Sequence, residues 1–448
     1  MRNLFIASLL VSLTVGVAHS QNAGQPAKAP IRPAAAKPVA PPKPASTPES
    51  RSAALLATSS EPVFDEGTYQ RIKEALLSYS DIQVRGGWPS LPPDAKLAAG
   101  ASGPNVALLR RLLVITDDMR PDQEAGDVYD AAVVEGVKHF QLRHGLDVTG
   151  SVGPQTLRAL NVPVGARIKQ LEASLDRLLG MDFLFAERYV VVNIPAAFVE
   201  AVANDKVERR YRVIVGKIDK PSPTLTASIT AVDLNPTWTV PLSITKTEIA
   251  AHMRKDPSYL ERMHMRLLGA HDDEISPSSV DWSGDRSFNF TVRQDAGTWN
   301  ALGYLKIDMP NSYSVYMHDT DTRKLFADDY RFDSHGCTRV DNVRDLAAWI
   351  LQDGPPNWDR AAIDAGIDAG QTRIINLPHK IPVAWVYLTG WVTRDGTVEF
   401  RDDVYKHDEA LDRDALAQAV NAGGFVQPAA TASTVPRAPV KQVSIDNR

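Results

Sequence analysis

Two hydrophobic periodicities divide the chain into two parts. Up to about residue 180, apolar side chains recur every three to four positions, for example at Val164, Ile168, Leu171, Leu175 and Leu178, which predicts amphipathic helices. From residue 187 onward, apolar residues alternate with polar ones or stand in short runs, which predicts β-strands. The chain is therefore predicted to be α+β, with a helical part followed by a mainly β part.

The helical part is predicted to contain a compact three-helix unit. Its helices cover residues 106–113 and 129–141 and a segment that begins at Pro154, after a glycine-bearing turn. Proline favours the first turn of a helix because its missing N–H would have no partner there. Further helices are predicted over 68–80 and 164–179, so that residues 61–101 and 163–186 form a helical scaffold on either side of the unit.

The second part is predicted to be a sheet with a few helices. Two strands over 188–195 and 209–216 flank a turn near Asn204 and Asp205. Further strands are predicted at 228–235, 288–293, 303–308, 313–318, 373–377 and 383–391, and helices at 341–352 and 359–367.

The first twenty residues have the pattern of a secretory signal peptide. A basic start is followed by the apolar run from Leu4 to Val17 and by small residues at Ala18 and Ser20, which predicts cleavage before Gln21. An uncleaved membrane anchor is the alternative, but the run falls short of the roughly 20 residues that span a bilayer. We therefore expect export, with no stable membrane insertion after cleavage.

Two further segments are predicted to be disordered. Residues 21–50 contain eight prolines and eight alanines and no aromatic residue, so they bury too little apolar surface to fold. We expect an extended spacer over 21–60 and a disordered tail over 427–448.

Charge and cysteine content exclude several classes of protein. The 448 residues carry a formal charge of −5, which leaves no basic surface for nucleic acid. Cys337 is the only cysteine, so neither an intramolecular disulfide framework nor a cysteine-based zinc cage is possible. A lone thiol in a large protein is either buried filler or a reactive group.

Residues 102–162 resemble the type 1 peptidoglycan-binding domain. A helix that ends in Phe-Gln and is followed by this glycine spacing is not a generic bundle pattern. The resemblance implies binding to glycan strands or stem peptides of the bacterial wall. The residues that carry it are Asp130, Val137, Phe140, Gln141, Gly145, Leu146, Gly150, Gly153, Thr156, Leu157 and Leu160.

The stretch around Cys337 has the residues that a cysteine nucleophile needs. Thiolate is the attacking species, so such a cysteine requires a nearby base. His318 lies 19 residues earlier (337 − 318 = 19) at the end of a predicted strand, and a loop that folds back would bring it close. Gly336 would let a substrate carbonyl approach the backbone. On these residues alone the catalytic signal is weak, and a buried cysteine with hydrogen-bonded core histidines is the favoured alternative.

His318 and the block Ser334-His335-Gly336-Cys337 follow one another along the chain. Together they resemble the YkuD-type L,D-transpeptidase signature, which consists of an upstream His and a Ser/Thr-His-Gly-Cys block. The resemblance covers about 187–410 and is closest to the large periplasmic subfamily of the YcbB type, which joins this catalytic domain to a peptidoglycan-binding domain. It implies a mainly β, sandwich-like mixed sheet, with a capping insertion over about 241–300. It also implies roles for six residues: Cys337 as nucleophile, His318 as general acid and base, and Ser334, His335, Gly336 and Arg339 around the oxyanion and the substrate.

The implied reaction is acyl transfer without a metal or organic cofactor. A tetrapeptide stem would lose its terminal D-alanine and be joined to the diaminopimelate amine of another stem, a 3→3 cross-link, in the periplasm of a Gram-negative bacterium. An L,D-carboxypeptidase or endopeptidase on the same scaffold and a non-catalytic wall-binding protein are the alternatives. A zinc wall peptidase is the weakest one, since no His-Glu-x-x-His or comparable cluster occurs.

Overall fold

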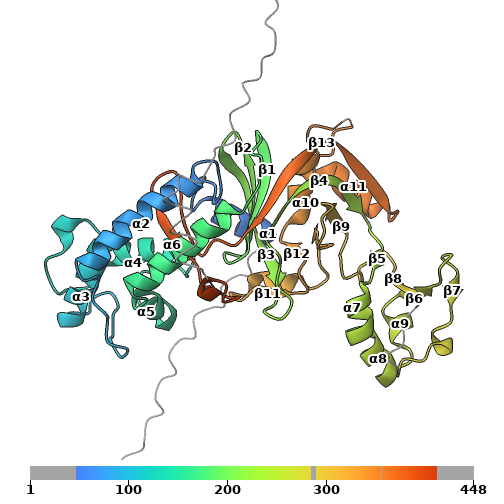
Figure 1. The fold of residues 1–448 in the computed structure, drawn as a ribbon, viewed down its shortest axis with the longest axis horizontal. Coiled ribbons are helices and arrows are strands. Elements are labelled where there is room, and N and C mark those ends of the chain that lie inside the picture. The colour runs from blue at the N-terminus through green and yellow to red at the C-terminus, as the bar shows by residue number, and fades with distance from the viewer. Residues whose placement is uncertain (1–46, 284–288, 355, 411–448) are drawn as a thin grey trace, which may run out of the picture. The chain divides into compact units, whose positions relative to one another are not determined.

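The computed structural model describes residues 47–283, 289–354 and 356–410 (Figure 1). Its architecture confirms the predicted α+β class, with helices before residue 180 and a large mixed sheet after it. The predicted signal peptide at 1–20, the first part of the spacer and the tail at 427–448 lie outside the described residues. In the described ranges, no helix combines the length and apolar character needed to cross a membrane.

A helix is present at each predicted place. The bounds of the helices are α1 (Pro48–Leu56), α2 (Thr68–Val84), α3 (Pro104–Ile115), α4 (Ala131–Arg143), α5 (Pro154–Leu160), α6 (Val164–Leu179), α7 (Leu242–Ile244), α8 (Ala250–Lys255), α9 (Tyr259–Arg262), α10 (Val343–Leu351) and α11 (Arg360–Asp368). Of these, α1, α7, α8 and α9 lie where none was predicted.

The strands begin directly after α6. Their bounds are β1 (Arg188–Asn193), β2 (Phe198–Ala203), β3 (Lys206–Gly216), β4 (Leu225–Leu234), β5 (Trp238–Thr239), β6 (Met265–Leu268), β7 (Glu274–Ile275), β8 (Thr291–Gln294), β9 (Leu305–Asp308), β10 (Met317–His318), β11 (Phe332–Ser334), β12 (Thr338–Val340), β13 (Arg373–Val386), β14 (Gly390–Val392) and β15 (Val398–Phe400).

Helix α1 corrects the predicted spacer, because residues 47–60 are folded. Thr47 caps the helix by accepting a hydrogen bond from the Ser50 amide, with Pro48 in the first turn. Arg51 then forms an ion pair with Asp341, in the sheet-containing part that follows residue 187, at 2.7 Å. The Pro/Ala composition hid this helix because its stability comes from a contact nearly 300 residues away in the sequence.

The large sheet closes on itself through β3. The pairing order is β11-β3-β12-β10-β9-β4-β13-β1-β2, and β2 pairs in turn with β3. Strand β3 is long enough to pair with β2 over its first half and with β12 and β11 over its second half. The large sheet is thus closed, mixed and strongly curved, and the ends of β10, β11 and β12 meet on one side of it.

Both faces of the sheet are buried, which explains the continuous apolar run in β1. Val190 and Val192 join the core inside the sheet, together with Leu346 and Ile350 of α10. The alternate residues Tyr189 and Val191 face a second core that contains side chains of α2 and α6. A strand covered on both faces reads as a hydrophobic run rather than as an alternation.

Residues 238–283 and 289–294 form a small subdomain with its own core. Its four strands pair in the order β5-β8-β6-β7, next to α7, α8 and the π-helical turn Thr245–Ile249 (Figure 1). The core of the subdomain is built from residues that include Val240, Ile249, Met253, Leu260, Leu267 and Val292. This segment overlaps the range of about 241–300 where a capping insertion is expected, and its capping role stays a prediction.

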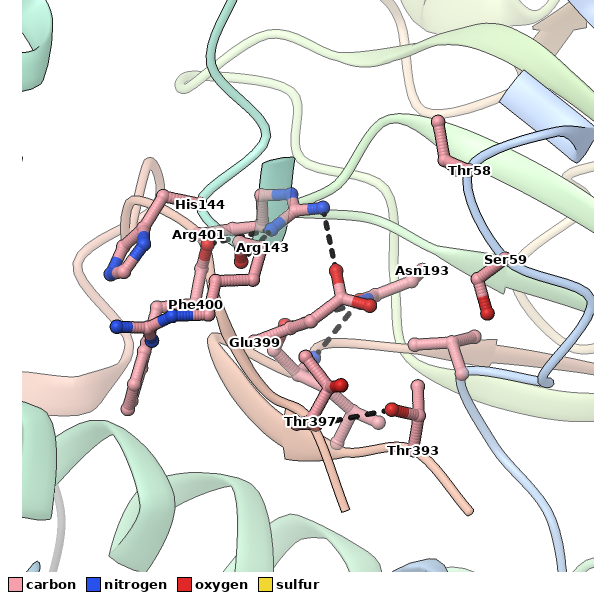
Figure 2. Close-up of polar contacts among 12 residues, drawn as sticks. Thr58, Ser59, Arg143, His144, Asn193, Thr393, Thr397, Glu399, Phe400 and Arg401 are labelled. Carbon is pink, nitrogen blue, oxygen red and sulfur yellow. Dashed lines mark hydrogen bonds and ion pairs between the residues drawn. The ribbon is translucent and has the colours of Figure 1, made fainter. Parts of the chain in front are cut away.

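Arginine contacts attach the helical unit, through α4, to strand β15. Arg143 at the end of α4 donates to the Val398 carbonyl at 3.1 Å, and Arg401 donates back to the Arg143 carbonyl at 3.0 Å. Arg401 is held in turn by an ion pair with Glu399 (Figure 2). These reciprocal hydrogen bonds join α4 to β15.

Candidate active site

Strand pairing brings His318 and Cys337 to neighbouring positions. Strands β10 and β12 are parallel, with Met317 opposite Thr338 and His318 opposite Arg339. The Thr338 amide donates to the Tyr316 carbonyl at 3.0 Å, which extends the pairing to the residue beside Cys337. The loop between the two strands does fold back, as the proposed base–nucleophile pairing requires.

The turn before Cys337 depends on Gly336 and Ser334. Gly336 has φ +109°, a conformation that glycine adopts without the strain that a side chain would bring. Its amide donates to the Ser334 hydroxyl at 3.2 Å, and that hydroxyl donates to the Cys337 carbonyl. The Ser222 hydroxyl donates to the Gly336 carbonyl at 2.7 Å. Ser334 and Gly336 therefore shape the turn, and the Gly336 amide is occupied by this internal hydrogen bond.

Cys337 is held as a neutral thiol. Burial raises its pKa to about 11, since a thiolate loses its hydration there. Hydrogen bonding by Tyr316 and the positive charges of Arg339 and Lys306 oppose this shift without reversing it. The thiol is therefore protonated at neutral pH until something accepts its proton.

His318 is held as a neutral imidazole. Burial lowers its pKa to about 3, and the charges of Arg339 and Lys306 lower it further against a hydrogen bond with the Asp319 backbone. Its Nδ1 atom is buried without a hydrogen-bond partner in the described part of the chain. A buried ring nitrogen without a partner is costly in a finished core and is typical of a site that awaits a substrate.

The ring of Tyr316 lies next to this pair. Its centroid is 5.7 Å from that of His318 in an edge-to-face arrangement. No hydrogen bond joins His318 directly to Cys337 among the described residues. Such contacts are often loose in a free enzyme and tighten only when the substrate binds.

Charged side chains of neighbouring strands lie in a row on the face of the sheet that carries His318. Lys306 stands opposite both Asp233 and His318 in the strand register, and residues directly opposite share a face. Its ammonium group lies 2.5 Å from Asp308, 3.5 Å from Asp233 and 5.0 Å from the Tyr316 ring centroid. Burial and Asp308 together raise the pKa of Asp233 to about 6.

Sequence analysis missed Tyr316, Lys306 and Asp233. A signal was present, because Lys306 and Asp308 alternate with Leu305 and Ile307, and charged residues are rarely turned into a buried sheet without a partner. What the sequence lacked was the pairing order that places β4, β9, β10 and β12 side by side.

Arg339 has no partner for its guanidinium group. Within the described ranges, neither a hydrogen bond nor an ion pair engages it, although it stands two residues from Cys337 on strand β12. An unpaired guanidinium group beside a nucleophile is suited to bind a carboxylate, because its planar fork matches the two carboxylate oxygens.

His335 points to the capping subdomain instead of to the cysteine. Its Nε2 atom lies 2.5 Å from a carboxylate oxygen of Glu248, in the π-helical turn Thr245–Ile249. This contact ties the catalytic turn to the cap. Lys246, His252, His264 and His271 of the same subdomain are exposed, and His252 and His264 stack on Tyr259 and Trp299.

Two family models match this chain over the same regions that the geometry singles out. Residues 187–374 match the L,D-transpeptidase catalytic domain (YkuD), and residues 102–160 match a domain described as "Putative peptidoglycan binding domain". The described residues hold no group of three or more His, Cys, Asp and Glu side chains placed for a metal ion.

Similar proteins were found in both sequence and structure. A Haemophilus influenzae protein named "Putative L,D-transpeptidase" is 29% identical over 223 residues, which are 50% of this chain but 45% of that protein. An L,D-transpeptidase structure from Mycobacterium smegmatis is 16% identical, with a TM-score of 0.22, and covers 45% of this chain and 58% of its own. One from Stackebrandtia nassauensis is 12% identical, with a TM-score of 0.25, and covers 58% and 91%.

The site and the family models together define the class of this protein. Residues 187–374 are a YkuD-type L,D-transpeptidase catalytic domain. The chain therefore combines a catalytic domain of this type with a peptidoglycan-binding domain in its helical part, and it spans less than half the length of the Haemophilus influenzae relative.

Proposed function

We propose that this protein is an L,D-transpeptidase that forms 3→3 cross-links in peptidoglycan through a thioester on Cys337. The observation that carries the proposal is the meeting of Cys337 and His318 on the paired strands β10 and β12, beside the unpaired Arg339. These three side chains supply a nucleophile, a proton acceptor and a carboxylate receptor. The two matched domains support peptidoglycan as the substrate.

The first half-reaction acylates the cysteine. The neutral imidazole of His318 accepts the Cys337 proton while Sγ attacks the carbonyl carbon at the L-centre of meso-diaminopimelate in a donor tetrapeptide. The tetrahedral intermediate then loses terminal D-alanine, whose nitrogen takes the proton back from His318. A C–S bond has formed and a C–N bond has broken, and the products are a thioester and free D-alanine.

The second half-reaction transfers the acyl group. The side-chain amine of another stem attacks the thioester carbonyl and gives a proton to His318, which returns it to the departing Cys337 sulfur. The result is a new amide bond and a regenerated thiol. Because a thioester stores the acyl group, no external energy source is needed for this step.

The remaining site residues have supporting roles. We assign oxyanion stabilisation to the Cys337 amide, because the Gly336 amide donates to Ser334. Arg339 is assigned to a substrate carboxylate, and His335 holds the cap against the catalytic turn through Glu248.

The proposed place of action is the periplasm of a Gram-negative bacterium, reached through the signal peptide at residues 1–20. Both matched domain types act on peptidoglycan, so the working location is extracytoplasmic. Carbapenems are expected to acylate Cys337, since they present a strained carbonyl to the same nucleophile.

Mass spectrometry of purified disaccharide-tetrapeptide after incubation with the full chain tests the proposal. A dimer lighter than two monomers by one molecule of alanine, absent with Cys337→Ala, is the expected product. Tripeptide monomer alone would indicate an L,D-carboxypeptidase, with water as acceptor. Binding without any product would leave a wall-binding protein.

A further inference from the structure

A deep groove separates the peptidoglycan-binding unit from the catalytic part. It has a volume of about 910 Å³ and runs from α4 and α5 to strand β3 and the segment 329–332. On the binding-unit side, Leu142 and Val148 expose apolar side chains into it. Figure 2 shows several residues that line the groove, among them Arg401 with its ion-pair partner Glu399. Pockets between domains are common sites of ligand binding.

Three of the seven arginines that line this groove are already paired with carboxylates. Arg143 is bound to Asp118, and Arg210 is bound to Glu200 at 2.7 Å. Arg401 is bound to Glu399 at 3.0 Å. These pairs are satisfied, so their positive charge is not available to a ligand.

No ion pair is formed by Arg158 or Arg167 on the helical side of the groove, or by two arginines at its catalytic end, among the residues that the structure describes. Arg212 donates to the Phe326 carbonyl and Arg331 to the Asp328 carbonyl, at 3.1 and 2.8 Å. The Nε atom of Arg331 is buried with no hydrogen-bond partner in the described chain. Both side chains line the groove.

The two guanidinium groups repel each other. Burial, followed by the charge of Arg212, lowers the pKa of Arg331 to about 10, even though Asp329 and Asp341 act in the opposite direction. Asp341 is already paired with Arg51. Two neighbouring cations with an unsatisfied N–H would be relieved by an anion from outside.

The position of Arg331 connects the groove to the active site. Its carbonyl accepts from the Val215 amide at 3.0 Å, which fixes the residue at the start of β11. Strand β11 ends at Ser334, inside the turn that carries Cys337. The neighbouring Tyr330 lines the groove with a side chain that is 59% exposed, so an aromatic ring stands beside the two cations.

We propose that this groove binds a carboxylate-bearing segment of a peptidoglycan strand, with Arg212 and Arg331 as the receptors of a stem-peptide carboxylate. The identity of this ligand rests on the proposed function, whereas the preference for a carboxylate rests on the two guanidinium groups. Planar guanidinium groups bind carboxylates in a bidentate way. The groove would hold a strand between the binding unit and the catalytic turn.

Titration calorimetry with soluble disaccharide-tetrapeptide tests the proposal on the full chain carrying Cys337→Ala, which prevents turnover. Arg331→Gln and Arg212→Gln should each weaken binding about tenfold, the loss expected for a charge-assisted hydrogen bond. Arg85→Gln is the matched control, because Arg85 is an exposed arginine of the helical scaffold that lies outside the groove. Its affinity should equal that of the parent.

A second arm uses the same fragment with its carboxylates amidated. This probe should bind the parent about tenfold more weakly and should not distinguish it from the two groove variants. Equal affinity of both probes for the parent, or an unchanged affinity in Arg331→Gln and Arg212→Gln, would overturn the proposal. If Arg331→Gln does not fold, as judged by its melting curve, Arg212→Gln and the amidated probe decide.

Turnover separates the failure of this proposal from failure of the proposed function. If the wild-type chain and Arg212→Gln form the cross-linked dimer with the same KM, the proposal that the groove binds a carboxylate is wrong and the proposed function stands. A wild-type chain that forms no product while its binding depends on Arg331 would refute the function and support the groove.

Discussion

The buried charges of the binding unit are paired, whereas the proposed nucleophile and base at the catalytic site are buried and neutral. In the helical unit, the Asp118 carboxylate is fully satisfied by Arg143, His139 and Thr116, at 2.5 to 2.8 Å. Burial would raise the pKa of Asp118, but the charge and hydrogen bonds of Arg143 outweigh it and the pKa is lowered. This cluster holds its charges permanently, as a structural network does.

At the catalytic site, burial leaves the Cys337 and His318 side chains uncharged, and one atom of His318 has no hydrogen-bond partner among the described residues. Burial raises the pKa of Cys337 and lowers that of His318, and the atom without a partner is Nδ1 of His318. The comparison shows that burial alone does not mark a functional site. A missing partner beside a nucleophile does, because stability would favour filling it.

Replacing the nucleophile should have the largest effect on activity and only a small effect on stability. Cys337→Ala is expected to lower the rate of cross-link formation by on the order of 10⁴ or more, since the other groups act only through the thioester. The stability should change by less than about 1 kcal/mol, because the side chain is small and only partly buried. Product analysis and urea unfolding measure the two quantities. Residual turnover in the variant would remove Cys337 from the mechanism.

Replacing the buried carboxylate of the binding unit should have the opposite outcome. Asp118→Asn leaves Arg143 buried without a counter-charge, so we expect a loss of about 3–5 kcal/mol in the free energy of unfolding. The turnover rate per folded molecule should stay the same. Urea unfolding followed by circular dichroism gives the first quantity, and Asp122→Asn, an exposed acid of the same unit, is the control.

The effect of Asp118→Asn should also depend on pH with a defined sign. The pKa of Asp118 is lowered on folding below its ordinary value of 3.8, so its stabilising contribution is present above that value and is lost as the pH falls through the folded pKa. The stability difference between wild type and variant should therefore shrink below about pH 4. A difference that grows on acidification would contradict the assigned ion pair.

Alkylation of Cys337 tests the neutral state of the pocket. With a pKa of about 11, the thiolate fraction rises tenfold per pH unit, so the rate with iodoacetamide should increase about 100-fold from pH 7 to pH 9. In the urea-unfolded chain the pKa returns toward 9.0, and the rate should level off near that pH. A rate in the folded protein that is flat above pH 7 would mean a thiolate already formed.

The smallest expected effect concerns Arg339. Arg339→Gln removes an unpaired cation, so KM for the tetrapeptide donor should rise about tenfold with little loss of stability. Arg339→Lys should recover part of this, because it restores charge but not the bidentate fork. Steady-state kinetics of D-alanine release provides the numbers. An unchanged KM in Arg339→Gln would place the substrate carboxylate elsewhere.

The local features of this protein were readable from its sequence. The α6 bounds coincide with the 164–179 prediction, and the turn at Asn204 and Asp205 joins β2 to β3 with both residues at positive φ. These features depend on neighbours within a few positions, where periodicity and turn chemistry operate.

Features that depend on distant partners were not readable. Helix α1 is stabilised by Asp341, and the charge row at Lys306 requires the pairing of β4, β9 and β10. The proposed roles of Cys337 and His318 came from a motif, whereas the neutral state of both groups follows from three-dimensional burial. Periodicity does not encode which strands become neighbours.

The most direct test of the account is the intact mass of the protein during turnover. Wild-type chain mixed with disaccharide-tetrapeptide should gain the mass of the donor minus one molecule of alanine, and proteolytic mapping should place this adduct on the peptide that contains Cys337. An adduct on another residue, or cross-linked product formed without any acylated protein, would contradict thioester chemistry at Cys337.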